Sequence, residues 1–294
     1  MDKFGIDVAQ WQGVIDWSKV KKDFAILKVT KKTNEIEPSF DRNYKGCLEN
    51  NIPVGVYRYV YARTVLEAMA EAQAIVKVLD GRSLPYGVWL DMEDKSIKIE
   101  KNALSIIVNT EAEILKAAGY NVGIYCNKDW YYNVLDGINL STQYPFWIAR
   151  YPRIDTGKFN EKSSLNPKSY SIAWQYSSKG KVDGINGNVD MDVLFVPIEE
   201  VFEKKAAEKK SSKVDNPYRA PKITLKRGSK GDSVRWVQYE LKKRGYGLGR
   251  YGIDGNYGPA TVKAVKKFQS DCFKNKKEVD GICGPKTIKA LKQN

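Results

Sequence analysis

Three acidic residues follow a short apolar run in the first third of the chain. Residues 87–90 have the composition of a buried strand, and Asp91, Glu93 and Asp94 come directly after it. Side chains alternate along a strand, so Asp91 and Glu93 project from the same face if the strand continues through them. Glycoside hydrolysis requires such a pair, one carboxyl to protonate the leaving oxygen and one to act as nucleophile or stabiliser. A solvated loop that contains three acids fits this motif equally well.

Two further acids stand on other apolar runs. Asp7 closes the first run of the chain, and Asp190 follows Val189 in the last run before residue 196. Aspartate often forms turns or caps, so neither residue alone indicates a site. If the strands close into a barrel, however, the first and last strands are neighbours, and Asp7 and Asp190 join the other acids at one end. Four acids that converge there favour a catalytic site.

Aromatic side chains on the same runs could stack on the faces of sugar rings. Tyr57, Tyr59 and Tyr61 alternate along one run and therefore share a face. Packing in the core is the commoner role of any single aromatic residue. The candidate substrate-binding residues are Tyr57, Tyr59, Tyr125, Trp147, Trp174 and Gln175.

The chain contains no histidine, which excludes Ser-His-Asp and Cys-His catalysis and removes the commonest zinc ligand. The four cysteines form no C-x-x-C pair, and we interpret them as reduced thiols and not as a disulfide framework or a metal cage. Any chemistry must therefore use carboxylates, hydroxyls, amides, aromatic rings, Lys and Arg. No metal and no cofactor are expected.

Short apolar runs alternate with helical patterns over the first two hundred residues. Helices are predicted where apolar residues recur every three or four positions, at residues 65–79 and 103–118. Strands are predicted at residues 5–9, 24–30, 53–61, 86–90, 121–126, 146–151, 171–176 and 189–195. This alternation favours an α/β fold with about eight parallel strands, a β/α barrel. Because the connections after residue 146 have the composition of loops, we expect an irregular barrel.

The last quarter of the chain is predicted to be a small all-α domain. Residues 199–222 are rich in Glu, Lys, Ala, Ser and Pro, and we interpret them as a linker between a catalytic domain at 1–198 and a second domain at 223–294. In the second domain, the pattern D-G-x-x-G-P occurs at Asp254 and again at Asp280, each time before an amphipathic segment. With a further helical pattern at residues 232–244, the repeat predicts three short helices around a small core.

The net charge of +14 is concentrated in this small domain. Residues 223–294 hold 17 Lys and Arg against 6 Asp and Glu, a net charge of +11. Such a surface suits an acidic partner, and nucleic acid, an anionic membrane and an acidic cell-wall polymer all qualify on charge alone. No run approaches the ~20 apolar residues of a membrane span, so insertion into a membrane is not expected. The first residues show no apolar stretch typical of a secretion signal.

The order and spacing of the motifs in residues 4–196 resemble those of the lysozymes of glycoside hydrolase family 25, the Chalaropsis-type muramidases. The resemblance rests on G-I-D-V-A-Q-W-Q-G (5–13), I-L-K-V-T (26–30), G-V-Y-R-Y (55–59), V-W-L-D-M-E-D (88–94), G-I-Y-C-N (123–127), F-W-I-A-R-Y (146–151), W-Q-Y-S (174–177) and V-D-M-D (189–192). It implies an irregular β/α barrel that cleaves the β-1,4 bond between N-acetylmuramic acid and N-acetylglucosamine.

The resemblance also implies roles for the acids. Glu93 corresponds to the general acid and Asp91 to the second catalytic carboxylate, while Asp7 and Asp190 complete the acidic site. As a hypothesis, Asp91 assists the 2-acetamido group of the substrate to attack the anomeric carbon. The neighbouring negative charges should keep a proton on Glu93 near neutral pH.

Four residues depart from the family pattern. Arg58 stands where His is usual, Lys31 and Lys32 where Glu-Gly is usual, and Asp192 where Asn is often found. None of them is one of the four proposed acids, so they concern the substrate groove more than the chemistry.

The small domain resembles the three-helix peptidoglycan-binding domain of many wall hydrolases. It matches at residues 225–238, 254–269 and 280–287. The resemblance implies non-covalent anchoring, which raises the enzyme concentration on an insoluble wall. The net charge of +11 would suit anionic wall polymers.

These features together predict a modular muramidase, in the first place an endolysin that waits in the host cytoplasm and acts on the bacterial cell wall. A bacterial autolysin has the same chemistry. A wall-binding protein without activity is a second class, and a nucleic-acid-binding protein, suggested only by charge, is a third. The sequence does not determine the oligomeric state.

Overall fold

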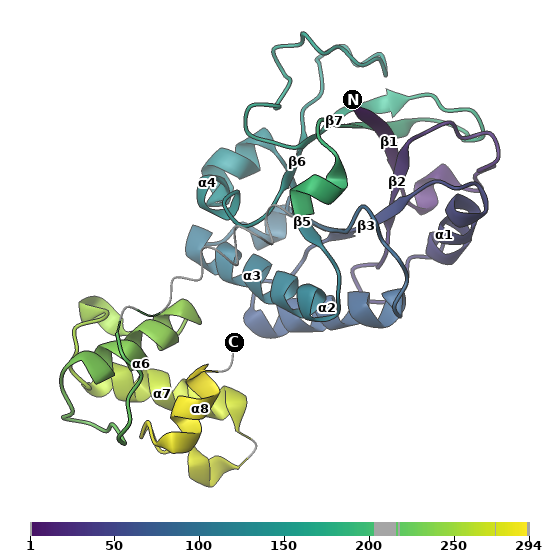
Figure 1. The fold of residues 1–294 in the computed structure, drawn as a ribbon. Coiled ribbons are helices and arrows are strands. Elements are labelled where there is room, and N and C mark those ends of the chain that lie inside the picture. Colours follow the sequence, from purple (N-terminus) through teal and green to yellow (C-terminus); the bar gives the residue numbers. More distant parts are fainter. Residues whose placement is uncertain (1, 203–215, 217, 274, 293–294) are drawn as a thin grey trace. The chain divides into compact units, whose positions relative to one another are not determined.

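The computed structural model describes residues 2–202, 216, 218–273 and 275–292, drawn as ribbon in Figure 1. The chain divides into two compact units, Met1–Ser211 and Ser212–Asn294.

The first unit is a closed barrel of eight strands in chain order. The strands are β1 (Lys3–Val8), β2 (Phe24–Lys28), β3 (Val54–Tyr59), β4 (Val88–Asp91), β5 (Val122–Asn127), β6 (Phe146–Ala149), β7 (Ala173–Gly180) and β8 (Val189–Leu194). Each overlaps one of the eight predicted strands, so the predicted α/β barrel is confirmed. Neighbouring strands from β1 to β7 are parallel, whereas β8 runs antiparallel to both β7 and β1. This reversal is the main irregularity of the barrel.

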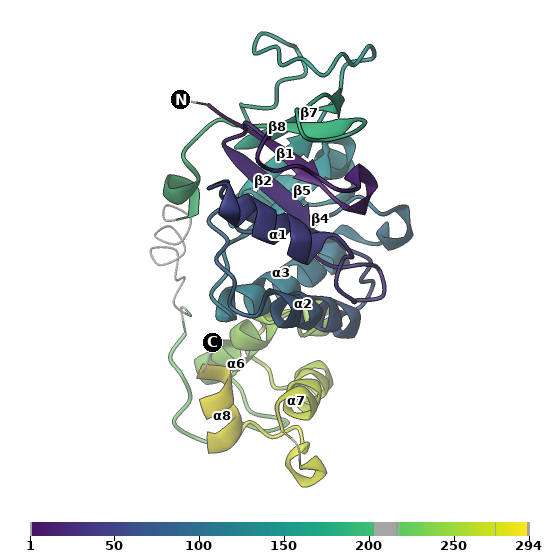
Figure 2. The same cartoon turned by 90° about the vertical axis from the view of Figure 1, so that its right-hand side faces the viewer.

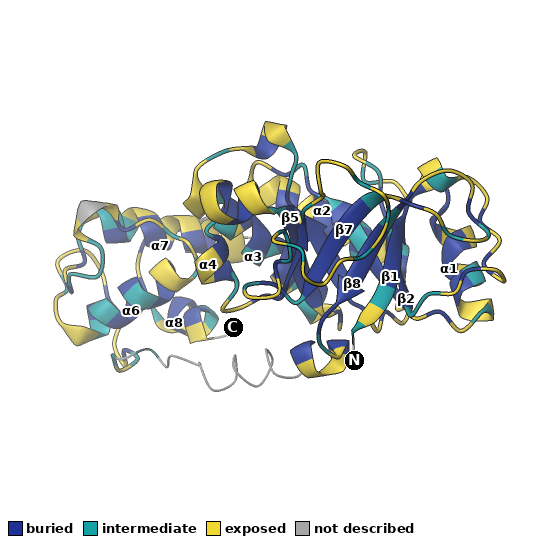
Figure 3. Ribbon diagram, turned by 90° about the horizontal axis from the view of Figure 1, so that it is seen from above, coloured by how far each residue is buried: buried dark blue, intermediate teal, exposed yellow. Residues whose placement is uncertain are grey.

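Three long helices cover the strands of the first half. They are α1 (Phe40–Glu49), α2 (Val65–Leu79) and α3 (Lys101–Ala117), and Figures 1 and 2 show them gathered on the side of the barrel away from β7 and β8. Helix α2 has the predicted bounds because Thr64 and Glu67 form a capping box at its start. Helix α1 was not predicted, although Phe40, Tyr44 and Cys47 bury one stripe of it. In Figure 3 these helices are buried on one side and exposed on the other.

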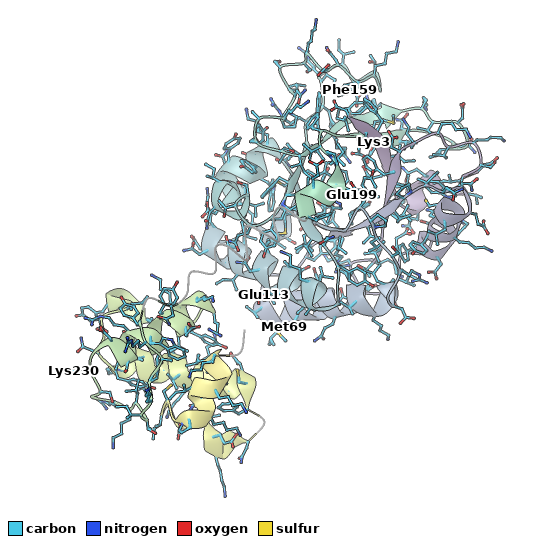
Figure 4. All side chains as sticks on the ribbon, viewed as in Figure 1. Lys3, Met69, Glu113, Phe159, Glu199 and Lys230 are labelled. Atoms are coloured by element: carbon cyan, nitrogen blue, oxygen red, sulfur yellow. The ribbon has the colours of Figure 1, made fainter. Side chains whose placement is uncertain are left out.

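Loops connect the later strands, as predicted. After β5 come only the short helices η3 (Trp130–Val134) and α4 (Gly137–Leu140), and the long loop at residues 150–172 joins β6 to β7. Phe159, labelled in this loop in Figure 4, packs its ring against Phe4, Trp174 and Tyr176 at centroid distances of 5.1 to 5.9 Å. The loop thus takes the place of a covering helix over β1 and β7.

The barrel interior is apolar at the amino ends of the parallel strands. Phe24 stacks on Tyr86 with ring centroids 4.5 Å apart, and Trp89 meets Trp147 edge-on at 5.8 Å. Phe202 closes this end, since it is buried in the same cluster with its ring centroid 6.4 Å from that of Trp89. This packed apolar end holds the strands in place, and the acids lie at their opposite, carboxyl ends.

The predicted linker at residues 199–222 lies largely outside the described residues. Its first residues do not behave as a linker, because Val201 and Phe202 are buried against the barrel. At its other end, Asn216 donates to the Trp236 carbonyl at 3.0 Å and Pro221 is buried in the small domain. Both domains therefore extend beyond the predicted bounds of 198 and 223. The predicted bounds are too narrow because a few apolar side chains within this charged stretch are buried against the domains.

Charged side chains are buried together between β3 and the helices α2 and α3. Arg58 is fully buried and forms an ion pair with Glu71 at 3.1 Å. It also donates to Thr30 Oγ1 at 3.0 Å and to the Lys31 carbonyl. Glu111 is buried nearby, and neither of its carboxyl oxygens has a hydrogen-bond partner among the described residues. Burial, reinforced by Glu71 and opposed by Arg58, holds the pKa of Glu111 well above its ordinary value.

The small domain contains the three predicted helices, α6 (Asp232–Lys243), α7 (Pro259–Cys272) and α8 (Pro285–Lys292). The two copies of the D-G-x-x-G-P pattern are held by the same set of hydrogen bonds. Gln238 Nε2 donates to Asp254 Oδ1 at 2.7 Å and to Thr261 Oγ1 at 3.1 Å, while its Oε1 accepts from the Gly255 amide at 2.8 Å. The buried Gln238 thus joins helix α6 to the turn that precedes the next helix, α7.

The second copy of this arrangement centres on Gln269. Its Nε2 donates to Asp280 Oδ1 at 2.9 Å and to Thr287 Oγ1 at 3.1 Å, and its Oε1 accepts from the Gly281 amide at 2.8 Å. The partners correspond one to one with those of Gln238. The repeated D-G turn is therefore held by a glutamine that lies outside the repeated motif itself.

Glu111→Gln tests the buried carboxyl. The folded state keeps a proton on Glu111 that the unfolded state releases at lower pH, so the free energy of unfolding should fall as pH rises above the ordinary glutamate pKa, by up to about 1.4 kcal/mol per pH unit. Glutamine does not titrate and should flatten this slope. Urea denaturation from about pH 5 to about pH 9 measures the effect. Glu113→Gln, an exposed position on the same helix (Figure 4), should keep the wild-type slope, and equal slopes in all three proteins would contradict the prediction.

Gln269→Ala tests the glutamine ties of the small domain. The substitution leaves buried donors and acceptors without partners, so it should lower the free energy of unfolding of this domain by about 1–3 kcal/mol. Gln238→Ala should have a similar effect, because its bonds are equivalent. Ser270→Ala, at the exposed position next to Gln269, is the control. A Gln269→Ala domain as stable as the control would show that the ties contribute nothing.

Candidate active site

The first and last strands bring Asp7 and Asp190 together. In the β1–β8 pairing Asp7 lies directly opposite Asp190, so their side chains share one face of the sheet. Because β8 is antiparallel, its first residues lie at the carboxyl ends of the parallel strands. Asp190 thereby reaches the end of the barrel where Asp7 closes β1. The predicted convergence of these two acids is present in the structure.

Asp91 and Glu93 extend from β4 to the same place. Strand β4 ends at Asp91, yet the backbone continues its pairing, since the Met92 amide donates to the Tyr125 carbonyl at 2.8 Å. Met92 is fully buried in the outer core, and Glu93 returns to the half-buried position that the alternation predicts. The negative charges of Asp91 and Asp7 act on each other, as do those of Glu93 and Asp190. All four predicted acids therefore lie in one cluster.

Gln175 orients Asp7. Its Nε2 donates to Asp7 Oδ2 at 2.5 Å, while its Oε1 accepts from Tyr125 Oη at 2.7 Å and also from Tyr151 Oη. Both acceptor positions of the amide oxygen are filled by hydroxyl donors, so only the NH₂ group can face the carboxylate. Tyr125 and Gln175 thus support the acid cluster, as does Tyr151, which the sequence analysis did not select.

Tyr57, Tyr59 and Lys28 line the β2–β3 side of the cluster. Tyr57 and Tyr59 are half-buried, and the Lys28 ammonium lies 5.7 Å from the centroid of each ring. The Lys28 charge also counteracts the rise in the pKa of Asp91. Lys28 was not predicted, although a lysine inside the apolar run 26–30 is an unusual strand residue that could have drawn attention.

The structure separates Trp147 from Trp174. Trp147 points into the barrel, packs against Tyr125 with ring centroids 4.5 Å apart, and donates from Nε1 to Asp192 Oδ1 at 3.1 Å. Trp174 lies on the outer face of β7, opposite to Gln175, and donates to the Arg150 carbonyl at 2.8 Å. Its ring packs against Phe159 and Tyr176. Of the six candidate substrate-binding residues, Trp174 is the one that the fold does not bring to the acids.

Burial and mutual repulsion raise the pKa of every acid in the cluster. Burial is the largest cause for Asp7, Asp91 and Glu93, and the charges of Asp190 on Asp7 and Glu93 and of Glu93 on Asp91 add to it. Burial, with a smaller contribution from Asp155, raises the pKa of Asp190 to about 6. Glu93 and Asp190 are half-buried, so they are the members that solvent and a substrate can reach. A protonated Glu93 at this position can act as a general acid.

Asp192 is a fifth member of the cluster that the sequence analysis did not include. It is fully buried two residues after Asp190, on the same face of β8 and opposite the side-chain-free Gly5. Among the described residues, its Oδ2 has no hydrogen-bond partner, and the carboxyl of Asp7 lies close enough to affect its pKa. Two carboxyl groups bond to each other only when one proton lies between them. Burial and the charge of Asp190 raise the pKa of Asp192, which favours its protonated form and would allow such a bond to Asp7.

The model of the glycosyl hydrolases family 25 matches residues 6–185, which include Asp7, Asp91 and Glu93 and end before β8. This chain belongs to glycosyl hydrolase family 25. It is therefore a glycoside hydrolase of the lysozyme type, in agreement with the resemblance found in its motifs. The peptidoglycan binding domain model matches residues 230–291 of the small domain.

Three relatives illustrate the two domains. The chain is 29% identical over 205 residues to the uncharacterized protein YegX of Escherichia coli, covering 67% of this chain and 71% of that one. It is 27% identical over 278 residues to the autolytic lysozyme of Clostridium acetobutylicum, covering 90% and 72%. The chain is also 36% identical over 72 residues to the N-acetylmuramoyl-L-alanine amidase CwlL of Bacillus licheniformis, covering 24% of this chain and 20% of that one.

Solved structures share the barrel. The bacterial lysozyme of Streptomyces coelicolor is 26% identical with a TM-score of 0.55, and the match covers 70% of this chain and 98% of that one. The autolysin LytC of Streptococcus pneumoniae, solved with a synthetic peptidoglycan ligand, is 23% identical with a TM-score of 0.55. That match covers 65% of this chain and 46% of LytC, and it shows a common fold.

Arg58 and Lys31, two of the departures from the family pattern, lie away from the acids. Arg58 occupies the position between Tyr57 and Tyr59 and so points to the opposite face of β3. It holds the Lys31 carbonyl and, at 2.7 Å, Asn34 Oδ1, which orders the loop after β2. These departures belong together on the outside of the barrel. Asp192, in contrast to Arg58 and Lys31, belongs to the acid cluster.

Asp192→Asn tests whether this residue serves as a hydrogen-bond donor to Asp7. Asparagine can accept from Trp147 through Oδ1 and donate to Asp7 through Nδ2, so activity on purified cell walls should stay within a few-fold of the wild-type value. Asp192→Ala removes the donor and should lower kcat/KM about tenfold or more. If both variants lose activity equally, the negative charge of Asp192 and not its proton is what the site requires.

Proposed function

We propose that the barrel is a muramidase that hydrolyses the β-1,4 bond between N-acetylmuramic acid and N-acetylglucosamine in peptidoglycan. The observation that carries the proposal is the half-buried Glu93, whose pKa is raised, beside the buried Asp91 and the half-buried Asp190. Family membership supports the reaction class. The autolytic lysozyme of Clostridium acetobutylicum, similar over most of the chain, supports the substrate.

Glu93 is the general acid in this proposal. Its proton passes to the glycosidic oxygen, so that the leaving sugar departs as a neutral alcohol and Glu93 becomes a carboxylate. The same carboxylate then takes a proton from the attacking water, which restores its starting state. The raised pKa serves the first of these steps, because it keeps the proton in place until substrate binds.

Asp91 acts on the acetamido group of the sugar. Its Oδ1 is buried and has no hydrogen-bond partner among the described residues, so it is available to accept from the N–H of that group. The bond orients the acetamido oxygen toward the anomeric carbon, where it displaces the leaving oxygen and is in turn displaced by water. Lys28 opposes the rise in the pKa of Asp91 and so favours the anionic form that this role needs.

The small domain anchors the enzyme to the wall. Its peptidoglycan binding family and its occurrence in an amidase, which carries a different catalytic activity, support a role in binding that is separate from the chemistry. The net charge of +11 on residues 223–294 suits anionic wall polymers in addition to peptidoglycan. Nucleic acid and membrane are not needed as partners, and none of the described helices has the length and apolar character that a membrane crossing would require.

The enzyme is proposed to be an endolysin that accumulates in the host cytoplasm before it reaches the wall. Free thiols support synthesis in a reducing compartment, since Cys47, Cys126, Cys272 and Cys283 are all unpaired and three of them are buried. An autolysin with the same chemistry is the alternative, which the name of the Clostridium acetobutylicum relative favours.

Glu93→Gln should lower the rate of wall lysis by about a hundredfold to ten-thousandfold, because glutamine cannot donate the proton. Glu100→Gln, at an exposed position before α3, is the matched control and should lyse walls at the wild-type rate. Mass spectrometry of the wild-type products should find N-acetylmuramic acid at the new reducing ends. N-acetylglucosamine ends or free peptides would refute the proposed bond, and a fully active Glu93→Gln enzyme would refute the role of Glu93.

A further inference from the structure

A large open pocket lies between two loops at the acid end of the barrel and is not explained by the cleavage of the glycan. Its volume is about 620 Å³. One wall is formed by residues 14–16 and 19, in the loop that follows β1, and the other by residues 181–187, in the turn that joins β7 to β8. Both loops leave the end of the barrel where Asp7 and Asp190 lie.

The two walls are joined into one preformed structure. The Asp16 amide donates to the Gly184 carbonyl at 2.9 Å, and Ile15 and Ile185 are buried beneath the loops. Gly184 has a φ of +87°, and a Cβ there would lie 2.3 Å from the Asp16 carbonyl oxygen, so only glycine allows this approach. Lys181 Nζ donates to the Gly187 carbonyl at 2.8 Å and holds the turn closed. The pocket therefore does not have to form when a ligand arrives.

Hydrogen bonds connect the pocket wall to the catalytic strand. Gln12 Nε2 donates to the Asn188 carbonyl at 3.4 Å, and Gln12 Oε1 accepts from the Ala9 amide at 2.9 Å. Asn188 follows the pocket residue Gly187 and stands two positions before Asp190. The pocket wall therefore runs directly into the strand that carries Asp190.

The charges in the pocket alternate in sign. Lys19 and Asp16 form an ion pair at 2.9 Å on one wall, and Lys181 and Asp183 stand on the other. No aromatic residue lines the pocket, so it lacks the ring faces on which sugars stack. Paired ammonium and carboxylate groups instead match a ligand that carries both carboxylates and amines. In peptidoglycan that ligand is the stem peptide on N-acetylmuramic acid.

We propose that this pocket, between the loop after β1 and the β7–β8 turn, binds the stem peptide of the muramic acid residue at the cleavage site. The inference rests on the proposed muramidase function and adds to it a preference for peptide-bearing glycan. Lys19 and Lys181 contact the peptide carboxylates, and Asp16 and Asp183 its amino groups. These residues contribute to affinity and leave the chemistry to the acid cluster.

The test compares two soluble substrates, glycan oligosaccharides that carry stem peptides and the same oligosaccharides after an amidase has removed the peptides. The double variant Lys19→Glu/Lys181→Glu should raise KM about tenfold for the peptide-bearing substrate, with unchanged kcat, and leave both constants unchanged for the peptide-free one. Lys162→Glu, at an exposed position in the loop at residues 150–172, is the charge-matched control. An unchanged KM for the peptide-bearing substrate, or an equal rise for both substrates, would overturn the inference.

A second measurement needs no variant. Titration of the wild-type protein with the free stem peptide, followed by NMR, should shift the amide resonances of Gly184 and Gly187. Absence of these shifts at millimolar peptide would overturn the inference even if the double variant were unstable. Wild-type protein that cleaves neither substrate would instead overturn the proposed function, and the inference with it.

Discussion

The structure depends on the burial of several carboxyl groups at one end of a barrel whose other end is apolar. Each buried charge would be costly alone, so the carboxyls must share protons or receive hydrogen bonds. Asp7 receives a hydrogen bond from Gln175, and Asp192, whose pKa burial and Asp190 raise, lies near it as a candidate partner for a shared proton. Burial, reinforced by the like charges of Asp190 and Asp94, raises the pKa of Glu93 and so favours the protonated form that a general acid needs.

The apolar half of the barrel makes this arrangement possible. Phe24, Tyr86, Trp89 and Trp147 fill the interior below the acids, and Phe202 closes the end. Trp147 belongs to both halves, because its ring packs in the apolar cluster while its indole N–H donates to Asp192. Packing in the apolar half of the barrel therefore fixes the position of the Asp192 carboxyl, and through it the position of Asp7.

A second buried set of charges serves a different purpose on the outside of the barrel. Arg58 joins β3 to the loop after β2 and to Glu71 on α2, and Glu111 on α3 lies close to them. The departures from the family pattern at residues 31 and 58 meet in this contact. This contact supports the barrel wall and involves none of the acids of the cluster.

The sequence alone determined the eight strands, the three helices of the small domain and the four acids, because hydrophobic period and motif spacing are local properties. The closure of the barrel could also be anticipated, and with it the meeting of Asp7 and Asp190. Which residue of a pair faces inward was decided only by the tertiary structure. Trp174 and Gln175 are neighbours on a strand that is buried on both sides, so polarity gives no sign of direction, and the pairing with β8 sends the glutamine in and the tryptophan out. The same holds for Asp192, whose partner is 185 positions away in the chain, and for the pocket built by two loops that only the closed barrel brings together.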